Sequence, residues 1–248
     1  MNVGFFGGTF DPIHRGHLVV ARAAEERFSL KQVYFVPSGV PPFKLAHPIT
    51  EFEHRYAMVA LAVAGEKIFV PSLLEAPRPT NVLHFQARSE RGNSQPTPNY
   101  SISTVRRLRS IVGRSAKIFF IVGVDAFLQI ASWREPEALL EEVEFVIASR
   151  PGSSMAQIAV ALPPSIRPPA AALKPFSRRK PRGSLVLPGA TLHLLDEINE
   201  NVSSTQIRAA AANKRSLDRY LTPEVADYIR KLQLYRGEAV SAGARGKR

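Results

Sequence analysis

The 248-residue chain contains no cysteine, which excludes disulfide bonds, thiolate catalysis and cysteine-based zinc sites. It also has no apolar run of about eighteen residues, so we expect neither a membrane-spanning helix nor a membrane partner. The first residues carry no charged leader and no cleavage-site pattern, and Val3–Phe6 are predicted to form a strand instead of a signal peptide. Together these absences favour a cytoplasmic protein.

Acidic residues are scarce compared with basic ones, and the formal net charge is +12. The excess is concentrated in two segments: residues 174–182 carry five basic and no acidic side chains, and residues 236–248 carry a net charge of +3. Both segments are rich in proline, serine, glycine or alanine, which predicts solvated basic loops. A nucleic-acid footprint is the alternative, but no aromatic residues are interleaved with the charge and no nucleic-acid motif occurs. We therefore expect no nucleic-acid partner, and a modestly basic remainder that suits anionic nucleotides.

Short apolar runs alternate along the chain with segments of helical periodicity. The predicted strands are residues 3–6, 33–36, 118–122 and 144–148, and the third is apolar throughout, as is typical of a parallel strand covered on both faces. The alternation predicts an α/β protein with a doubly wound parallel sheet, whose ligands bind outside the carboxyl ends of the strands at the switch in strand order. Two helical faces are predicted, one from Phe52, Tyr56, Val59 and Val63 and one from Ile102, Val105, Leu108 and Ile111.

The predicted organisation is a single domain over residues 1–235 and a disordered basic tail over residues 236–248. Residues 86–99 and 163–184 interrupt the alternation with polar, proline-rich or basic sequence and are predicted to be loop insertions.

The last part of the domain is predicted to be small and helical, after a short strand near residue 190. One helix should follow residues 201–205. The last should open at Thr222-Pro223-Glu224, with Thr222 as a plausible N-cap and Pro223 as the first helical residue.

The most informative segment is Gly7-Gly8-Thr9-Phe10-Asp11-Pro12-Ile13-His14-Arg15-Gly16-His17, in which a predicted strand, a glycine turn and a helix start follow one another. Glycines allow the backbone to approach a ligand, and free amides at a helix N-terminus attract a phosphate. His14 and His17 would point the same way and could donate hydrogen bonds to phosphate oxygens. Metal ligation by the two histidines is the alternative, although no third ligand is obvious. The segment is not a Walker A loop, because Lys and Ser/Thr do not follow the glycines.

This segment resembles the (T/S)-F-D-P-x-H-x-G-H signature of the nucleotidylyltransferase superfamily. Further segments are similar to those of bacterial nicotinate mononucleotide adenylyltransferases. They are the proline-proline-x-lysine loop at 36–44, the helix with His54-Arg55 and Met58, Asn99-Tyr100-Ser101 where the family carries Ser-Tyr-Thr, the Gly-x-Asp turn at 122–126 followed by Trp133, and the later segments 148–152, 202–208 and 220–235.

The resemblance implies a Rossmann-like nucleotidylyltransferase fold and a reaction of NAD biosynthesis. In that family, ATP and nicotinate mononucleotide condense to deamido-NAD and pyrophosphate, and the acceptor phosphate attacks the α-phosphorus of ATP directly. Such a reaction needs positioning and charge stabilisation, not a protein nucleophile. The implied cofactor is Mg²⁺ carried by ATP, with no protein ligands to the metal.

The resemblance also implies roles for particular residues. The implied catalytic residues are His14, His17, Lys44 and Arg208. The implied ATP-binding residues are Gly7, Gly8, Thr9, Phe10, His14, Gly16, His17, Gly123, Asp125, Ser203, Ser204, Thr205 and Arg208. The implied residues for nicotinate mononucleotide are Lys44, Tyr100, Ser101, Asp125 and Trp133.

Each of these roles has a simpler structural alternative. The hydroxyl groups of residues 203–205 could cap a helix, Asp125 could do the same, and Trp133 could pack in the core. Capping and phosphate binding are compatible.

Several departures from the family pattern leave the acceptor open. Phe43 stands where many relatives carry His, and Ser38-Gly39 stands where Asn residues are frequent. Alternative acceptors are nicotinamide mononucleotide and phosphopantetheine. A nucleotide-binding regulator without catalysis is a third hypothesis, and the joint presence of His14, His17, Lys44 and Arg208 argues against it. A homo-oligomer is compatible with the sequence.

Overall fold

The structure is a computed structural model that describes residues 1–39, 49–77, 98–149, 154–169, 172, 183–195 and 202–236. Four predictions therefore fall wholly or largely outside the described residues: Lys44, the basic segment 174–182, the tail from residue 237 onward, and most of the 86–99 insertion.

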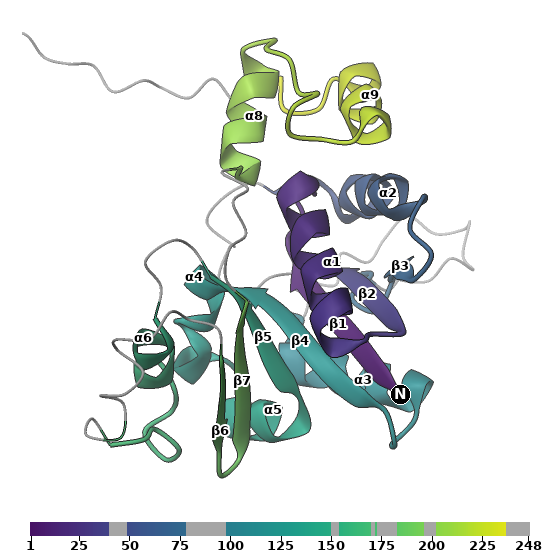
Figure 1. Cartoon of the computed structure of the whole chain (residues 1–248). Coiled ribbons are helices and arrows are strands. Elements are labelled where there is room, and N and C mark those ends of the chain that lie inside the picture. The colour runs from purple at the N-terminus through teal and green to yellow at the C-terminus, as the bar shows by residue number, and fades with distance from the viewer. Residues whose placement is uncertain are drawn as a thin grey trace, which may run out of the picture.

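In the described part of the chain, a seven-stranded sheet has the strand order β3-β2-β1-β4-β5-β7-β6 (Figure 1). The six parallel strands are β1 (Asn2–Gly8), β2 (Gln32–Pro37), β3 (Phe69–Pro71), β4 (Lys117–Gly123), β5 (Glu144–Ala148) and β7 (Ala190–Leu195). The antiparallel edge strand is β6 (Gly183–Leu187). The chain adds β2 and β3 on one side of β1 and then returns to add β4 on the other, so the order reverses between β1 and β4.

Helices cover both faces of the sheet, which confirms the prediction of a doubly wound α/β fold. One face is covered by α1 (Arg15–Phe28) and α2 (Phe52–Val63), and α8 (Ser204–Ala212) and α9 (Pro223–Leu232) add side chains to the same core from beyond the end of the sheet. The other is covered by α3 (Ser101–Val112), α4 (Val124–Phe127), the 3₁₀ helix η1 (Ile130–Ser132), α5 (Pro136–Glu142) and α6 (Met155–Val160). None of the helices described is long and apolar enough to cross a membrane.

Strand β4 shows why its sequence is apolar throughout. Phe119 and Ile121 pack into the core under α1, whereas Ile118 and Phe120 pack into the core under α3 and α5. Because successive side chains of a strand point to opposite faces, both sets are buried when helices cover both faces. The predicted strands at 3–6, 33–36, 118–122 and 144–148 are all confirmed.

Two predictions on helices and strands need correction. Ile111 was expected on the buried face of its helix, but its side chain is 63% exposed. Steps of three residues drift around a helix, so that a residue nine positions after Ile102 lies about 180° from it. The loop predicted to end at residue 184 gives way to β6 at Gly183, because Gly183 and Ser184 pair with Leu194 and His193 of β7.

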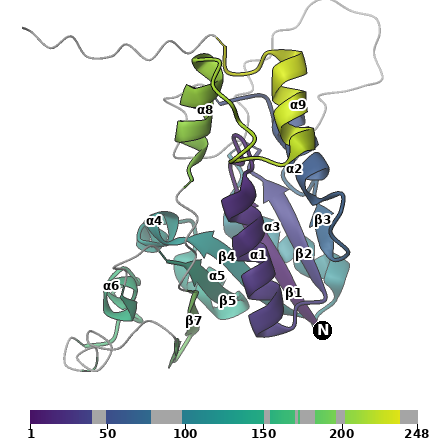
Figure 2. The same ribbon diagram turned by 45° about the horizontal axis from the view of Figure 1, so that its top comes forward.

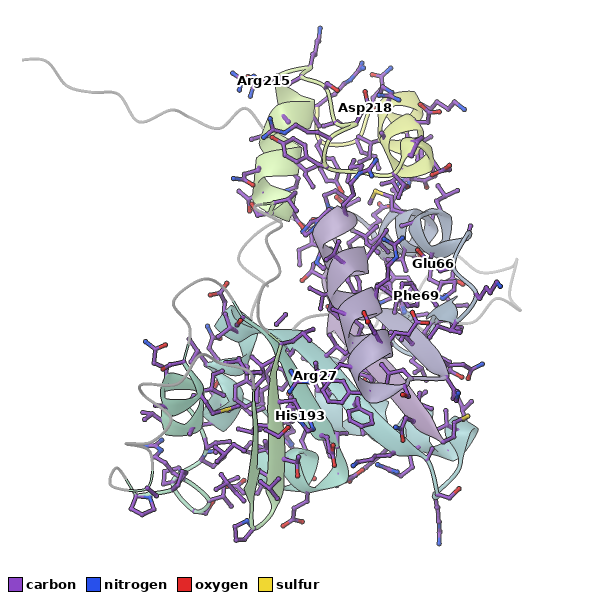
Figure 3. The ribbon with its side chains drawn as sticks, viewed as in Figure 1. Arg27, Glu66, Phe69, His193, Arg215 and Asp218 are labelled. Carbon is purple, nitrogen blue, oxygen red and sulfur yellow. The ribbon has the colours of Figure 1, made fainter. Side chains whose placement is uncertain are left out.

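The C-terminal helices α8 and α9 lie at the end of the molecule where α1 begins, as Figures 1 and 2 show. The Tyr228 hydroxyl of α9 and His54 Nδ1 of α2 form a hydrogen bond of 2.9 Å. The Thr222 side chain makes no capping hydrogen bond, although Thr222 is the N-cap residue of α9 and Pro223 begins the helix, as predicted. At the far end of α1, Arg27 lies beside His193 (Figure 3) and donates to the carbonyl of Leu194 at 2.6 Å.

Candidate active site

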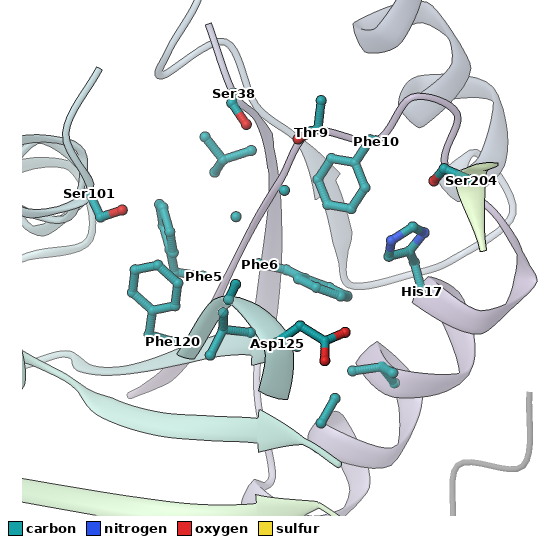
Figure 4. Close-up of a pocket in the computed structure, with 18 of the residues that line it drawn as sticks. Phe5, Phe6, Thr9, Phe10, His17, Ser38, Ser101, Phe120, Asp125 and Ser204 are labelled. Atoms are coloured by element: carbon teal, nitrogen blue, oxygen red, sulfur yellow. The ribbon is translucent and has the colours of Figure 1, made fainter. Parts of the chain in front are cut away.

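A cavity of about 1280 Å³ opens at the carboxyl ends of β1 and β4 (Figure 4). Its wall contains the last residues of four neighbouring strands or the residues just after them, including Gly8, Ser38, Gly123 and Ser149. Because the strand order reverses between β1 and β4, the cavity lies at the switch point where the sequence predicted a ligand site.

The turn after β1 shapes the floor of the cavity. Phe10 adopts a left-handed backbone conformation, with φ of 49°, which costs an L-residue roughly 1–2 kcal/mol. Burial of its ring offsets this cost, since Phe10 is only 2% exposed and packs against Phe6 and Phe35. The same ring contacts the imidazole of His17 edge-on, with 5.0 Å between the ring centroids. The strained turn therefore places an aromatic support behind His17.

His14 and His17 stack on each other at the start of α1, with ring centroids 3.7 Å apart. The backbone N–H of His14 donates to His17 Nδ1 at 3.1 Å, which assigns the proton of the neutral His17 ring to Nε2. Burial lowers the pKa of His14 to about 4, and burial together with the neighbouring His14 lowers the pKa of His17 well below its ordinary value. Both rings are therefore neutral at pH 7, and His17 can donate a hydrogen bond from Nε2.

The N-terminus of α8 lies on the same side of the cavity as α1. Ser203 is its N-cap residue: its hydroxyl accepts from the Gln206 N–H at 3.3 Å, and the Gln206 side chain accepts from the Ser203 N–H at 3.0 Å. The capping alternative is thus confirmed for Ser203, which also lines the cavity with Ser204. Two helix N-termini therefore present their positive ends to the same space.

Thr205 and Arg208, two residues with an implied role in phosphate binding, do not line the described cavity. The Arg208 guanidinium donates to the backbone carbonyl of Asp11 at 2.8 Å and lies within 3.5 Å of Thr205 Oγ1. Neither side chain is part of the described cavity wall. Arg208 thus holds the turn between β1 and α1 from the side away from the cavity, and direct contact of Thr205 and Arg208 with ATP stays a prediction.

Buried polar side chains fix that turn, and sequence reasoning missed their role. Asp11 is 6% exposed and accepts hydrogen bonds from the Tyr235 hydroxyl at 2.8 Å and the Thr50 N–H at 3.3 Å. Arg55 is 2% exposed and donates to the carbonyls of Thr9 at 2.8 Å and Thr50 at 2.7 Å. Arg55 was noted only within a resembling helix, and the sequence carries no other sign of these contacts.

The opposite side of the cavity holds the residues predicted to bind the acceptor. Figure 4 shows Ser101 well separated from His17 and Ser204, with Phe5, Phe120 and Asp125 between them. Tyr100, Ser101 and Trp133 all line this side, and Trp133 is half-buried with its ring 6.0 Å from that of Phe120.

Asp125 also lines the cavity and is exposed to it. The N-cap of α4 is Gly123, so Asp125 is the second residue of that helix and not its cap.

Glu75 lines the cavity, although the sequence did not indicate a role for it. Its carboxylate is 7% exposed and accepts from Thr104 Oγ1 at 2.7 Å and from the Gly39 N–H at 3.2 Å, and burial raises its pKa. A methyl group on Gly39 would overlap the backbone carbonyl of Glu75 and the side-chain amide of Asn99. This close approach explains why glycine stands at position 39, where asparagine is frequent in the resembling family.

The fold and the cavity together define a nucleotide-binding α/β protein. A family model described as cytidylyltransferase-like matches residues 5–210. The chain is 37% identical to a probable nicotinate-nucleotide adenylyltransferase of Moorella thermoacetica, over 94% of this chain and 91% of the relative. It is 34% identical to the protein of that name from Thermoanaerobacter sp., over 95% of each. The chain therefore belongs to the nicotinate-nucleotide adenylyltransferases of the cytidylyltransferase-like family.

Solved structures share the fold at lower sequence identity. The Plasmodium falciparum nicotinic acid mononucleotide adenylyltransferase complexed with NaAD superposes with a TM-score of 0.64 at 20% identity, covering 94% of this chain and 97% of that one. A putative nicotinate-nucleotide adenylyltransferase from Vibrio parahaemolyticus gives a TM-score of 0.57 at 17% identity, covering 95% and 96%. Both structural similarities support the fold, whereas the family assignment rests on the sequence relatives.

Proposed function

We propose that this chain transfers the adenylyl group of ATP to nicotinate mononucleotide, giving deamido-NAD and pyrophosphate. The observation that carries the proposal is one cavity with two unlike sides. Stacked neutral imidazoles and two helix N-termini form a phosphate-binding side, and Trp133 with Tyr100 forms an aromatic side. The names of the sequence relatives support the same reaction.

The phosphate-binding side would hold the triphosphate of ATP. Backbone N–H groups at the starts of α1 and α8 favour an anion, and Gly7 and Gly8 let the chain approach it. His17 would donate from Nε2 to a non-bridging oxygen of the α-phosphate, where negative charge increases during the reaction. A bound phosphate would also raise the pKa of both imidazoles, since an adjacent negative charge favours the protonated form.

In the proposed reaction, an oxygen of the acceptor phosphate forms a bond to the α-phosphorus. The bond between that phosphorus and the oxygen bridging to the β-phosphate breaks, and pyrophosphate leaves with the electron pair. The cavity supplies positioning and charge stabilisation, which is the main catalytic contribution in phosphoryl and nucleotidyl transfer. Additional phosphate contacts from Lys44, Thr205 and Arg208 remain part of the proposal.

Mg²⁺ is proposed to arrive with the triphosphate. The carboxylates of the described wall belong to Glu75 and Asp125. Both oxygens of Glu75 already accept hydrogen bonds, from Thr104 and Gly39. Among the described residues, no group of three side chains able to hold a metal is gathered in one place. Such surroundings fit an ion coordinated mainly by phosphate oxygens and water, which Mg²⁺ favours. The ion would neutralise charge on the β- and γ-phosphates.

The experiment that tests the proposal is pyrophosphate release from ATP and Mg²⁺ with each candidate acceptor in turn. We expect turnover with nicotinate mononucleotide and much weaker turnover with nicotinamide mononucleotide. Turnover with phosphopantetheine alone would redirect the proposal to another adenylyl acceptor. No turnover with any acceptor, together with binding of ATP, would favour a nucleotide-binding regulator.

The cellular setting also remains a proposal. We propose a cytoplasmic protein without nucleic-acid or membrane partners, in line with its cysteine-free sequence. Light scattering of the purified chain would show whether it forms a homo-oligomer.

A further inference from the structure

The charge of the described cavity wall is unevenly distributed. Its acidic residues are Glu75 and Asp125, and Arg134 is the only lysine or arginine among the residues described there. His14 and His17 add no charge at pH 7, because burial holds their pKa values low. Arg134 is therefore the only positively charged side chain of the described wall at pH 7, and the proposed acceptor is an anion.

Arg134 lies on the aromatic side of the cavity, next to Trp133, for which the resemblance implies contact with nicotinate mononucleotide. It follows Trp133 directly, and its guanidinium carbon is 5.5 Å from the centroid of the Tyr100 ring. A guanidinium at that distance is attracted by the face of the ring, which holds the cation near the aromatic pair. Tyr100 is itself the N-cap residue of α3 and is half-buried, so it provides a fixed platform.

Among the residues that the structure describes, the Arg134 guanidinium forms only a weak ion pair. Its ion pair with Glu135 spans 3.8 Å, and the two side chains are 63% and 46% exposed. Glu135 also accepts from Arg106 at 3.2 Å, so its carboxylate is shared between two cations. A weak, exposed pair of this kind contributes little and can be replaced by a ligand carboxylate.

We propose that Arg134 binds the carboxylate of the pyridine ring and thereby selects the acid form of the mononucleotide over the amide. This inference rests on the proposed function and names the group that sets its acceptor specificity. A guanidinium matches a planar carboxylate with two parallel N–H donors, whereas a neutral carboxamide offers one acceptor and an NH₂ group that opposes the cation. The acid is thus favoured by attraction and the amide disfavoured by a mismatch of donors.

The test compares kcat/KM for the nicotinate and nicotinamide mononucleotides in the wild type and in Arg134→Gln, Arg134→Lys and Arg114→Gln. Arg114→Gln is the matched control, because Arg114 is exposed in the turn between α3 and β4, at the amino end of that strand. For Arg134→Gln we expect a loss of about tenfold to a hundredfold with the nicotinate substrate, carried mainly by KM. The value for the nicotinamide substrate should change by less than about threefold. Arg134→Lys should keep part of the preference for the nicotinate substrate, because lysine retains the positive charge but lacks the two parallel N–H donors of a guanidinium.

Equal losses with both mononucleotides would overturn the inference, since they would place Arg134 on the shared phosphate or in a structural role. Unchanged values with both would overturn it as well. Thermal unfolding of all variants should show similar midpoints, because the side chain is exposed. A wild-type protein that turns over neither mononucleotide would instead contradict the proposed function, and that result is distinguishable from a failure of the Arg134 assignment.

Discussion

The hydroxyl of Tyr235 donates a hydrogen bond to Oδ1 of Asp11 at 2.8 Å, although the two residues stand 224 positions apart in the sequence. Burial and the Asp11 carboxylate raise the pKa of Tyr235, so the hydroxyl stays a donor at any physiological pH. Asp11 belongs to the turn between β1 and α1. The last described turn of the chain thus fixes the segment that presents His14 and His17.

We expect Tyr235→Phe to reduce both stability and catalysis. Loss of a buried hydrogen bond to a carboxylate costs about 1.5–3 kcal/mol, and a looser turn misplaces His17. Urea unfolding measures the first effect and kcat the second.

Tyr228→Phe is the matched control, because its hydroxyl bonds His54 of α2 and not the turn. This variant should lose stability with kcat unchanged. Equal effects of the two variants on kcat would show that the Tyr235 contact has no special link to the site.

His17→Ala should lower kcat by roughly a hundredfold or more with a modest change in KM for ATP. The reason is that a donor aimed at developing charge acts mainly in the transition state. Steady-state kinetics at saturating acceptor measures this split. His54→Ala serves as the control, since His54 is an imidazole of α2 that is not part of the described cavity wall. An unchanged kcat in His17→Ala would make the imidazole structural.

The low pKa of His14 predicts a pH dependence of stability. Its value falls from the ordinary 6.5 to about 4 on burial, so between these pH values the unfolded chain holds a proton that the folded chain does not. Stability should therefore fall as pH drops through this window, and His14→Asn should lose part of that slope. Unfolding midpoints at pH 7 and pH 5 measure it. An NMR titration showing His14 protonated near pH 6.5 in the free protein would contradict the prediction.

Trp133→Ala should raise KM for the mononucleotide by about tenfold, because stacking on an aromatic contributes roughly 1–3 kcal/mol per base. Trp133 is half-buried at the cavity, so stability should change little. Trp133→Phe should show an intermediate KM. If KM stays constant while the unfolding midpoint drops, the Trp133 ring stabilises the core and does not bind the mononucleotide.

Gly16→Ala tests how closely α1 and α8 must approach. A methyl group on Gly16 would lie 3.0 Å from Val202 Cγ1 and 3.1 Å from His14 Nδ1, tight enough to push these groups away. We expect KM for ATP to rise about tenfold, since small displacements of positioning groups have large effects. Gly65→Ala is the control, because nothing lies within 4 Å of its added methyl group. Equal kinetics of both variants would count against the convergence of the two helix N-termini.

Local patterns in the sequence were sufficient to predict five of the six parallel strands and the glycine turn, whereas the three-residue strand β3 was not predicted. The run Ile118–Val122 is apolar because helices cover both faces of its strand. An apolar run of this length in the sequence therefore predicts a strand that is buried on both faces. The buried face of α3 and the antiparallel edge strand β6 were harder to predict from the sequence. Ile111 lies outside the buried face of its helix. Strand β6 follows a basic, proline-rich segment, and it is recognised as a strand only by its pairing with β7.

Contacts between distant segments could not be predicted in this way. The bonds from Tyr235 to Asp11 and from Arg55 to Thr9 depend on how the C-terminal helices and α2 close over the turn. Glu75 is held in the cavity wall by hydrogen bonds from Gly39, which follows β2, and from Thr104 of α3, and nothing near Glu75 in the sequence indicates a ligand. The position of Arg134 follows from η1, which turns the chain so that Trp133 and its neighbour reach the cavity.

The most direct test of the central claim uses ATP labelled at the α-phosphorus, incubated with Mg²⁺, nicotinate mononucleotide and the purified chain. Separation of the products then shows where the label resides. We predict that it appears in deamido-NAD, in equal amounts with unlabelled pyrophosphate. Label recovered as AMP, or retained in ATP while the protein is folded and binds the nucleotide, would contradict adenylyl transfer to this acceptor.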